Sequence, residues 1–462
     1  MLFTSWDFAG FLLVLLPLYW AIPSRLAQNW LLLVASYVFY GWVAPWWLVL
    51  VLVSTLLDWS CAQAIERWRP LRNRFLVASL VGNLGLLGTF KYFDFFAENV
   101  AAACGALGLT VSPPALRLVL PAGISFYTLQ TMSYTIDVWR GELRARRSFV
   151  DFALYVSFFS QLVAGPIERA GNLLPQAERP RRFRFEQFQS AFPLLVTGFF
   201  KKLVVADNVA GHVDRIFMLE SPTLPVLLAG SLAFSAQIFC DFSGYSDIAR
   251  GTARLLGFEV MENFRAPYLS VTLDEFWRRW HISLSTWIRD YLYVPLGGSR
   301  APGALRRHGV LLATMGISGL WHGAAWTFVI WGLWHGLGLV ACRVSGFDRR
   351  WTDRSRGAAL LSWAVTFGFV VIGFGLFRAH SLGWFARGLA GVGGLTSRGE
   401  LLTAVSITAT TAALALPLVA LHVATKALPR ATAVQSALRW ALVAGLVLLA
   451  REGGREFIYF QF

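Results

Sequence analysis

Apolar stretches long enough to cross a lipid bilayer recur along the chain, and they constrain its fold more than any other feature. The hydrocarbon core of a bilayer is about 30 Å thick, so an α-helix needs about 20 mainly apolar residues to span it. Apolar runs, some of them shorter than this, lie around residues 8–22, 30–57, 75–90, 188–200, 224–240, 310–320, 324–341, 358–377, 401–421 and 437–450. Allowing for broken or doubled segments, we expect an all-α polytopic membrane protein with roughly ten to thirteen membrane-embedded helices.

The composition supports a membrane protein built as one domain. Of the 462 residues, 56% are hydrophobic and 15% are charged, whereas a soluble domain carries about a quarter charged residues. The first apolar run follows a segment whose only charge is Asp7, and no small-residue cleavage site follows the run, so we expect a retained helix rather than a signal peptide. Since no polar stretch is long enough for a soluble domain, we expect a single domain over 1–462, with supporting helices at 1–120 and 346–462 around a core at 121–345.

Basic residues outnumber acidic ones by 41 to 26, a formal net charge of +15, and the excess lies in short clusters between apolar runs. Loops of this kind normally face the cytoplasm and contact anionic lipid. That interpretation explains the charge better than a nucleic-acid surface, so we expect membrane lipids and no nucleic acid as partners. The clusters are Arg67, Arg69, Arg72 and Arg74; Arg140, Arg144, Arg146 and Arg147; Arg179, Arg181, Arg182 and Arg184; and Arg349, Arg350, Arg354 and Arg356.

The four cysteines, at positions 61, 104, 240 and 342, are scattered and form no close-spaced metal pattern. They are typical of small core residues, and we expect neither a disulfide framework nor a metal site.

The middle of the chain departs from regular spanning helix. Between about residues 121 and 336, Gly, Pro, aromatic and polar residues crowd otherwise apolar contexts, and 121–140 and 161–169 are typical of short, broken or re-entrant helices. Irregular backbone at membrane depth is tolerated only where it is buried in protein or lines a wet cavity. We therefore expect the middle of the chain to surround a chamber.

Charges and tryptophans alternate in EFWRRWHISLSTWIRDYLYVPLGG, residues 275–298. Taken as one helix, this segment predicts an amphipathic helix along the membrane interface, with Asp274 and Arg278 paired at i,i+4. A helix of that kind accounts less well for His281, which is therefore a candidate functional residue. One face carries Trp277, Trp280, Leu284, Trp287 and Tyr291, and the opposite face carries Asp274, Arg278, His281, Ser285 and Arg289.

Two further histidines interrupt the apolar segment GISGLWHGAAWTFVIWGLWHG, residues 316–336. Ionisable groups at membrane depth are costly and tend to face a bundle interior or a water-filled path, which makes His322 a second candidate. A neutral histidine in a packed helix interface is the competing interpretation, and we favour it for His335. Gly332 and Gly336 form a small-xxx-small face typical of close helix packing.

Asp241 and Asp247 lie in QIFCDFSGYSDIARG, residues 237–251. They could line a polar pocket or orient an imidazole, but we favour a structural network with the arginines of 275–298. Walker A, GxSxG and HExxH motifs are missing from the sequence. What remains is a histidine-centred site, in which a neutral imidazole takes a proton from a hydroxyl that attacks an acyl group.

The order of four segments resembles the membrane-bound O-acyltransferase family, and within it the bacterial alginate O-acetylase branch. The segments are DFSGYSDIA at 241–249, MENFRAPYLS at 261–270, the segment 275–298, and GLWHGAAWTFVIWGLWHG at 319–336. Further matches at 35–42, 120–141, 162–169, 198–207 and 457–462 extend the resemblance over nearly the whole chain, most weakly between about 346 and 452.

The resemblance implies two functional histidines, His281 and His322, with His322 as the catalytic residue near the membrane centre. It implies no bound cofactor and no metal, with acetyl-CoA as the acyl donor. The residues that we expect to line the chamber or bind substrate are Trp277, Arg278, Trp280, Asp241, Tyr245, Asn263 and Trp321. The sequence departs from the family pattern at Ser160, where a proline is expected, and at Ala325, where many relatives carry Asn, and the second change leaves the substrate open.

The expected function is transfer of an acetyl group from a cytoplasmic donor towards a hydroxyl of an exported polysaccharide, with His322 as general base. An extracytoplasmic acetyltransferase is the expected partner protein, and one of its serines is an alternative immediate acceptor. The expected location is the inner membrane, as a multi-pass protein. The alternatives are D-alanyl transfer to teichoic acid, a glycan transporter or flippase, and an idle scaffold that recruits the partner.

Overall fold

Helices account for all regular secondary structure in the part of the chain that the computed structural model describes, which is every residue except 164, 348–351, 392–395, 451–454, 456 and 459–462. The basic positions 349 and 350 and the last four residues of the chain lie outside the described residues. Eight described helical stretches are long and apolar enough to span a membrane, and Trp6–Ala21 and Phe149–Leu162 are shorter apolar helices. The prediction of an all-α polytopic membrane protein is therefore confirmed. The eight are Trp47–Arg67, Arg69–Ala106, Phe185–Phe217, Leu224–Leu255, Trp326–Ser345, Arg356–Arg378, Arg398–Ala427 and Thr432–Leu449.

The chain folds as two compact units. Unit 1 comprises residues 1–188, 252–261 and 323–325, and unit 2 comprises 189–251, 262–322 and 326–462. Unit 1 holds α1 (Trp6–Ala21), α2 (Arg25–Gly41), α3 (Trp47–Arg67), η1 (Arg69–Leu71), α4 (Arg72–Leu87), η2 (Gly88–Tyr92), α5 (Phe93–Ala106), α6 (Ile124–Arg140), α7 (Phe149–Ser157), α8 (Phe159–Leu162) and α9 (Ala170–Ala177). Helices α10 (Phe185–Phe199) and α12 (Leu224–Leu255) contribute residues to both units.

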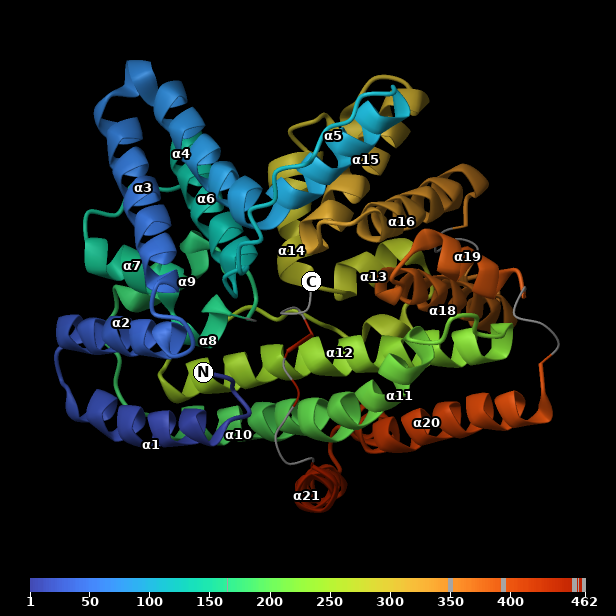
Figure 1. Cartoon of the computed structure of the whole chain (residues 1–462). Helices are drawn as coiled ribbons and strands as arrows, with labels where there is room; N and C mark the ends of the chain where they lie inside the picture. The colour runs from blue at the N-terminus through green and yellow to red at the C-terminus, as the bar shows by residue number, and fades with distance from the viewer. Residues whose placement is uncertain (164, 348–351, 392–395, 451–454, 456, 459–462) are drawn as a thin grey trace. The chain divides into compact units, whose positions relative to one another are not determined.

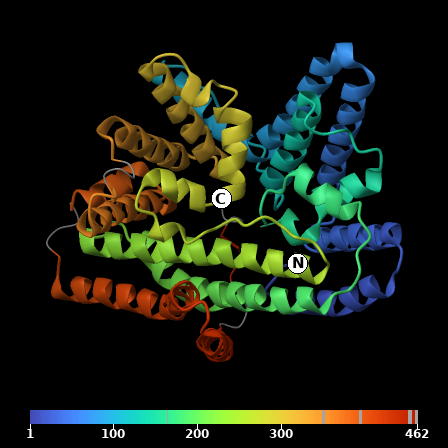
Figure 2. The same ribbon diagram turned by 180° about the vertical axis from the view of Figure 1, so that it is seen from behind.

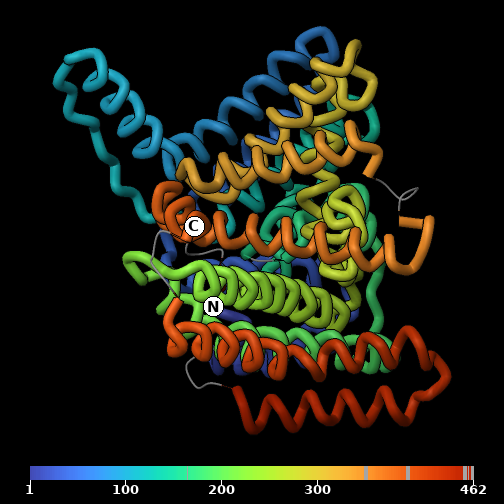
Figure 3. The backbone as a smooth tube through the Cα atoms, turned by 90° about the vertical axis from the view of Figure 1, so that its right-hand side faces the viewer, coloured from blue at the N-terminus to red at the C-terminus, as the bar shows by residue number. Residues whose placement is uncertain are grey.

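Unit 2 holds the remaining helices, among them a long pair near the end of the chain, α20 and α21, which lie side by side (Figure 3). Helix α20 begins at a capping box, in which Glu400 N donates to Ser397 Oγ and Ser397 N donates to Glu400 Oε2. The elements are η3 (Phe200–Ala206), α11 (Asp207–Phe217), η4 (Pro267–Leu269), α13 (Leu273–Arg279), α14 (Ile282–Ile288), η5 (Arg289–Tyr293), η6 (Gly298–Arg300), α15 (Ala304–His322), α16 (Trp326–Ser345), α18 (Arg356–Arg378), α19 (Leu382–Leu389), α20 (Arg398–Ala427) and α21 (Thr432–Leu449).

A buried polar network holds α3, α4 and α6 together in unit 1, where the three helices lie side by side (Figures 1 and 2). The Asp58 carboxylate accepts hydrogen bonds from Ser79 Oγ, from Asn83 Nδ2 at 2.7 Å and from Thr135 Oγ1 at 2.7 Å. Ser54 Oγ in turn donates to Asn83 Oδ1 at 2.9 Å. All five side chains are fully buried, so the network satisfies its own polar atoms between the helices.

The prediction for residues 121–140 was wrong in part. Most of this segment forms one continuous helix, α6, because Gly123 and Gly141 adopt positive φ angles of 78° and 80° and so confine the irregular backbone to its two ends. The described residues of 161–169, which exclude 164, do follow the prediction, since α8 has four residues and irregular backbone at 165–169 precedes α9.

Helices α15 and α16 form a hairpin in which the backbones approach closely at glycines. A Cβ atom added at Gly332 would lie 2.1 Å from Met315 O, and one added at Gly319 would lie 2.1 Å from Phe328 O. At Gly336 the added atom would lie 3.2 Å from Met315 Cβ. The close packing predicted for Gly332 and Gly336 is confirmed, and it fixes His322 at the end of α15 against residues of α16.

Candidate active site

The segment that carries His281 is broken into two short helices, and the prediction of one amphipathic helix across it was wrong. Helix α13 ends at Arg279 and α14 begins at Ile282, because His281 adopts a left-handed conformation with φ 42° and ψ 56°. Backbone hydrogen bonds from Arg265 N to Arg279 O (3.0 Å) and from Ile282 N to Asn263 O (2.9 Å) hold the break in place. These long-range bonds offset the strain of a non-glycine residue in this region.

The break changes where the aromatic side chains lie. Trp280, Leu284 and Trp287 are 2%, 2% and 7% exposed, so they belong to the protein core rather than to a lipid-facing surface. Trp280 stacks on Phe276 at 5.5 Å and 17°. Arg278 by contrast is exposed and pairs with Asp274, as the i,i+4 spacing predicted. This pair lies at the surface, whereas His281 and His322 are buried.

His281 is held by Asn263, which lies 18 residues earlier. The imidazole Nδ1 is 3.1 Å from Asn263 Oδ1, and that oxygen also accepts from Ser283 N (3.2 Å) and Ser283 Oγ (3.0 Å). Asn263 Nδ2 donates to Ser246 Oγ at 3.4 Å, which orients the amide so that its oxygen faces the imidazole. This orientation assigns the proton to Nδ1 and leaves the basic lone pair on Nε2.

Burial keeps His281 neutral. The residue is 1% exposed and lies between α13 and α14, outside the eight spanning helices. Burial lowers the pKa of its imidazole to about 3. At physiological pH the ring is therefore uncharged.

His322 is brought close to His281, although 41 residues separate them in the sequence. The two ring centroids are 6.5 Å apart. His322 is 4% exposed and contacts Trp321 at 5.0 Å, Trp331 at 5.1 Å and Phe377 at 5.5 Å. Trp321 also contacts His281 at 6.1 Å, so the two candidate histidines share an aromatic enclosure within unit 2.

Asp241 and Tyr245 contact residues near the C-terminus, Ile458 and Phe457. Lys202 Nζ lies 2.7 Å from Asp241 Oδ1 and 2.9 Å from Asp207 Oδ1. The other oxygen of Asp241 accepts from Ile458 N at 2.7 Å. Tyr245 packs against Phe457 at 4.4 Å. The buried acid thus forms a structural network, although its cation is a lysine of η3 and not an arginine of 275–298 as we had predicted.

The prediction that Asp247 pairs with an arginine of 275–298 was also wrong. Its carboxylate pairs with Lys201 at 2.6 Å and with Arg250 at 3.7 Å. In the described structure neither Asp241 nor Asp247 pairs with an arginine of 275–298, because Arg278 and Arg279 pair with Asp274 and Glu275 of their own helix and Arg289 pairs with Asp290.

Comparisons with known proteins agree with this arrangement. A model of the membrane-bound O-acyltransferase family matches residues 140–378, which include both histidines. The probable alginate O-acetylase of Pseudomonas putida is 41% identical over 382 residues, which cover 82% of this chain and 77% of that protein. The chain belongs to the membrane-bound O-acyltransferase family.

Other relatives of this O-acyltransferase act on different polymers. The peptidoglycan O-acetyltransferase of Helicobacter pylori is 34% identical over 396 residues, or 79% of this chain and 73% of that protein. The teichoic acid D-alanyltransferase of Bacillus subtilis is 26% identical over 283 residues, or 57% of this chain and 70% of that protein. The family therefore fixes acyl transfer as the reaction class and leaves the acceptor polymer open.

Several residues around the acyltransferase histidines were not predicted from the sequence. Phe242 contacts His281 at 4.6 Å, and Phe457 packs on Phe242 at 5.7 Å. Phe377 gave no signal because it is an ordinary residue of an apolar run. Lys202 could have been found, since a lysine inside an apolar run requires a buried anionic partner.

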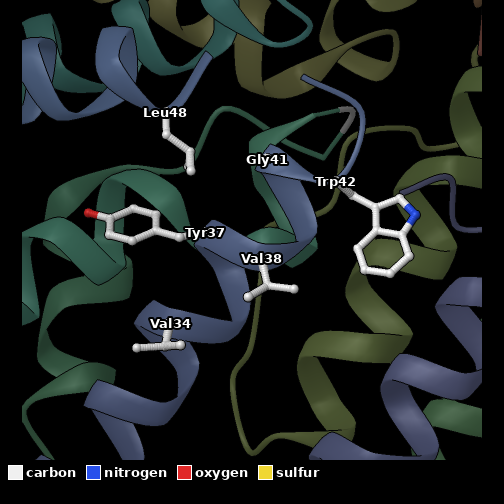
Figure 4. A pocket seen from close by; sticks show the side chains of 6 residues that line it. All are labelled: Val34, Tyr37, Val38, Gly41, Trp42 and Leu48. Atoms are coloured by element: carbon white, nitrogen blue, oxygen red, sulfur yellow. The ribbon is translucent and has the colours of Figure 1, made fainter. Parts of the chain in front are cut away.

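No group of three or more His, Cys, Asp or Glu side chains arranged to hold a metal occurs among the described residues. A cavity of about 390 Å³ in unit 1 is lined by Val34, Tyr37, Val38, Gly41, Trp42 and Leu48 (Figure 4). Val34, Val38 and Trp42 are each about half exposed, at 54%, 46% and 54%. This lining offers no base or nucleophile matched to acyl transfer, so we place the candidate active site at the histidines of unit 2.

Proposed function

We propose that this O-acyltransferase takes an acetyl group from cytoplasmic acetyl-CoA and passes it towards a hydroxyl of an exported polysaccharide, with His322 as the general base. The observation that carries the proposal is the pairing of His322 with His281 in one buried aromatic enclosure, at a ring separation of 6.5 Å. Water is largely excluded there, which favours transfer of the acyl group over its hydrolysis.

In the proposed reaction, His322 removes the proton of the acceptor hydroxyl as its oxygen attacks the thioester carbonyl carbon. The C–O bond forms, the C–S bond breaks, and the proton passes from His322 to the departing thiolate. His322 is the last residue of α15. The negative end of the helix dipole favours the positive charge that the imidazole gains while it holds the proton.

His281 acts in this scheme as a positioning or proton-relaying residue. Asn263 fixes the orientation of its ring and the position of its proton. A neutral ring with its lone pair on Nε2 can accept a hydrogen bond from the acceptor or from a water molecule. It does so without adding a charge beside His322.

The proposed setting is the inner membrane, with an extracytoplasmic acetyltransferase as partner. Relatives named as alginate and peptidoglycan O-acetyltransferases support an exported polysaccharide as the final acceptor. A serine of the partner is the alternative immediate acceptor.

The test uses the full chain in lipid nanodiscs with radiolabelled acetyl-CoA, with and without a candidate partner. We expect His322→Gln to lower acetyl release or transfer by about 10²- to 10⁴-fold, the usual contribution of a general base. His308→Gln is the matched control, because His308 lies near the other end of the same helix. Equal rates in wild type and His322→Gln, at equal melting temperature, would exclude His322 as the base.

A further inference from the structure

A second group of rings lies next to the histidine pair and is not used by the proposed reaction. His335 is fully buried, with 0% of its surface exposed. Its ring lies 5.1 Å from that of Trp277 and 5.0 Å from that of Trp331, and Trp277 and Trp331 lie 5.9 Å from each other. We call these three residues the indole–imidazole cluster. They come from α13 and α16 of unit 2.

The cluster contains polar atoms that the protein does not satisfy. Within the described structure, Trp277 Nε1, Trp331 Nε1 and both ring nitrogens of His335 make no hydrogen bond. Buried polar atoms are nearly always paired, and repeated exceptions in one place require an explanation.

Three other tryptophans of unit 2 have an acceptor for the indole N–H. Trp334 Nε1 donates to Phe369 O at 3.2 Å, Trp363 Nε1 to Tyr268 O at 2.8 Å, and Trp384 Nε1 to Leu219 O at 2.7 Å. The fold thus supplies backbone carbonyls to indoles that serve only packing. The two indoles beside His335 receive none within the described structure.

The unpaired donors and acceptors indicate which chemical group could bind there. Each indole N–H is a donor, and a neutral imidazole donates from one nitrogen and accepts at the other. A secondary amide matches this set, since its carbonyl oxygen accepts and its N–H donates. Its flat faces also suit ring walls, which here include Phe276, stacked parallel to His335 at 6.2 Å and 8°.

The cluster lies close enough to His322 to bind an amide of a thioester that reacts there. The ring of Trp331 contacts that of His322 at 5.1 Å and that of His335 at 5.0 Å. In a pantetheine thioester, only two methylene groups separate the sulfur from the nearest amide. A thioester that reacts at His322 therefore carries an amide within reach of Trp331.

We propose that Trp277, Trp331 and His335 form a subsite for the amide of the donor's pantetheine arm that lies nearest to the thioester. This inference rests on the proposed use of acetyl-CoA. Trp277 is the half-buried member of the cluster, so the amide reaches the subsite from its side. The three residues position the donor, and His322 remains the base.

The experiment compares two short donors that differ in the amide alone, with the full chain in nanodiscs. The S-acetyl thioester of N-acetylcysteamine carries the amide, and S-pentyl thioacetate replaces it with methylenes at equal chain length. We expect kcat/KM of the wild type to favour the amide donor by at least about tenfold, because a site built to hydrogen-bond a group rejects an analogue without it. The same pair, tested as competitors of acetyl-CoA, reports affinity even where turnover is slow.

Variants of the cluster residues test whether the preference for the amide donor arises there. Trp277→Phe and His335→Phe keep an aromatic ring and remove the polar atoms. We expect the ratio between the two donors to fall towards one in both variants, through loss with the amide donor alone. Trp384→Phe is the matched control, because its indole N–H already has a carbonyl partner, and it should leave the ratio unchanged.

The outcomes separate this inference from the proposed function. Turnover of acetyl-CoA by the wild type without preference for the amide donor, or an equal loss with both donors in the variants, would overturn the subsite and leave the acetyl-CoA reaction standing. In that case the cluster packs as aromatic rings or holds water. Failure of the wild type to use any thioester, acetyl-CoA included, would overturn both.

Discussion

The Asp58 network of unit 1 and the indole–imidazole cluster of unit 2 are both buried groups of polar side chains, but they treat their polar atoms in opposite ways. Around Asp58, each carboxylate oxygen accepts from a neighbouring helix. Around His335, four nitrogens have no partner in the described structure. A network that satisfies itself can hold helices together, whereas a cluster that does not is suited to bind something else.

The comparison predicts that damage to the Asp58 network lowers stability and not the intrinsic rate. Asp58→Leu leaves the buried hydroxyls of Ser79 and Thr135 without this acceptor, and Asn83 Nδ2 keeps only its bond to Ser79 O. Loss of three hydrogen bonds to one carboxylate should cost on the order of 4 kcal/mol of unfolding free energy. The expected result is a large fall in melting temperature in detergent, with kcat per folded molecule unchanged.

Asp58→Asn is the control for this prediction. It keeps one acceptor oxygen in nearly the same volume, so it should lose less stability than Asp58→Leu. If both variants kept the wild-type melting temperature, the network would not be the scaffold that we infer. A fall in kcat without any loss of stability would instead make Asp58 part of the catalytic machinery.

Asn263 sharpens the comparison, because its side chain is hydrogen-bonded within the protein and also orients His281. In Asn263→Ala, His281 and Ser283 lose the oxygen that three of their hydrogen bonds share. We expect kcat to fall by about tenfold to a hundredfold, since His281 loses its defined orientation and proton position. The measurement is kcat beside KM for acetyl-CoA, with Asn263→Asp as the variant that retains an acceptor.

Asn263→Asp should recover part of the rate, and its pH profile should shift because a carboxylate now faces His281. A fall in stability with equal kcat for Asn263→Ala, Asn263→Asp and wild type would reduce Asn263 to a packing residue.

Much of this fold could be predicted from the sequence because lipid imposes simple rules. The length of apolar runs predicted most of the membrane helices, and the spacing of Gly332 and Gly336 predicted close helix packing there. These features depend on local composition alone. The cores of both units follow from them only in outline, since pairing partners such as Lys202 and Asp241 are set by the tertiary fold.

The break at His281 shows what the sequence does not contain. No glycine or proline marks it, and the helical period continues across it. The left-handed conformation depends on Arg265 and Asn263, whose backbone atoms pair with residues 279 and 282. The motifs and the family resemblance identified both histidines as candidates, but only the three-dimensional structure places Asn263 against His281 and brings Trp331 into contact with both His322 and His335.

The smallest predicted effect is a pair of opposite pH dependences of stability, one in each unit. Burial lowers the pKa of His281 from 6.5 to about 3. The unfolded chain then binds more protons between these values, so the unfolding free energy should fall as pH decreases below 6.5, by up to about 1.4 kcal/mol per pH unit. Burial raises the pKa of Glu168 in unit 1 from 4.5 to about 7. Here the folded chain binds more protons, so stability should fall as pH rises from 4.5 to 7.

Single variants separate the two slopes in melting curves recorded between pH 5 and 7.5. His281→Asn should reduce the loss on the acid side, and Glu168→Gln should reduce the loss on the alkaline side. Asn172 Nδ2 and Met261 N donate to different oxygens of the Glu168 carboxylate, so the glutamine keeps an acceptor for one of them and should lower stability at every pH while it reduces the slope. If Glu168→Gln left the slope above pH 5 unchanged, the carboxyl would be ionised across this range, and its hydrogen bonds would outweigh the cost of its burial.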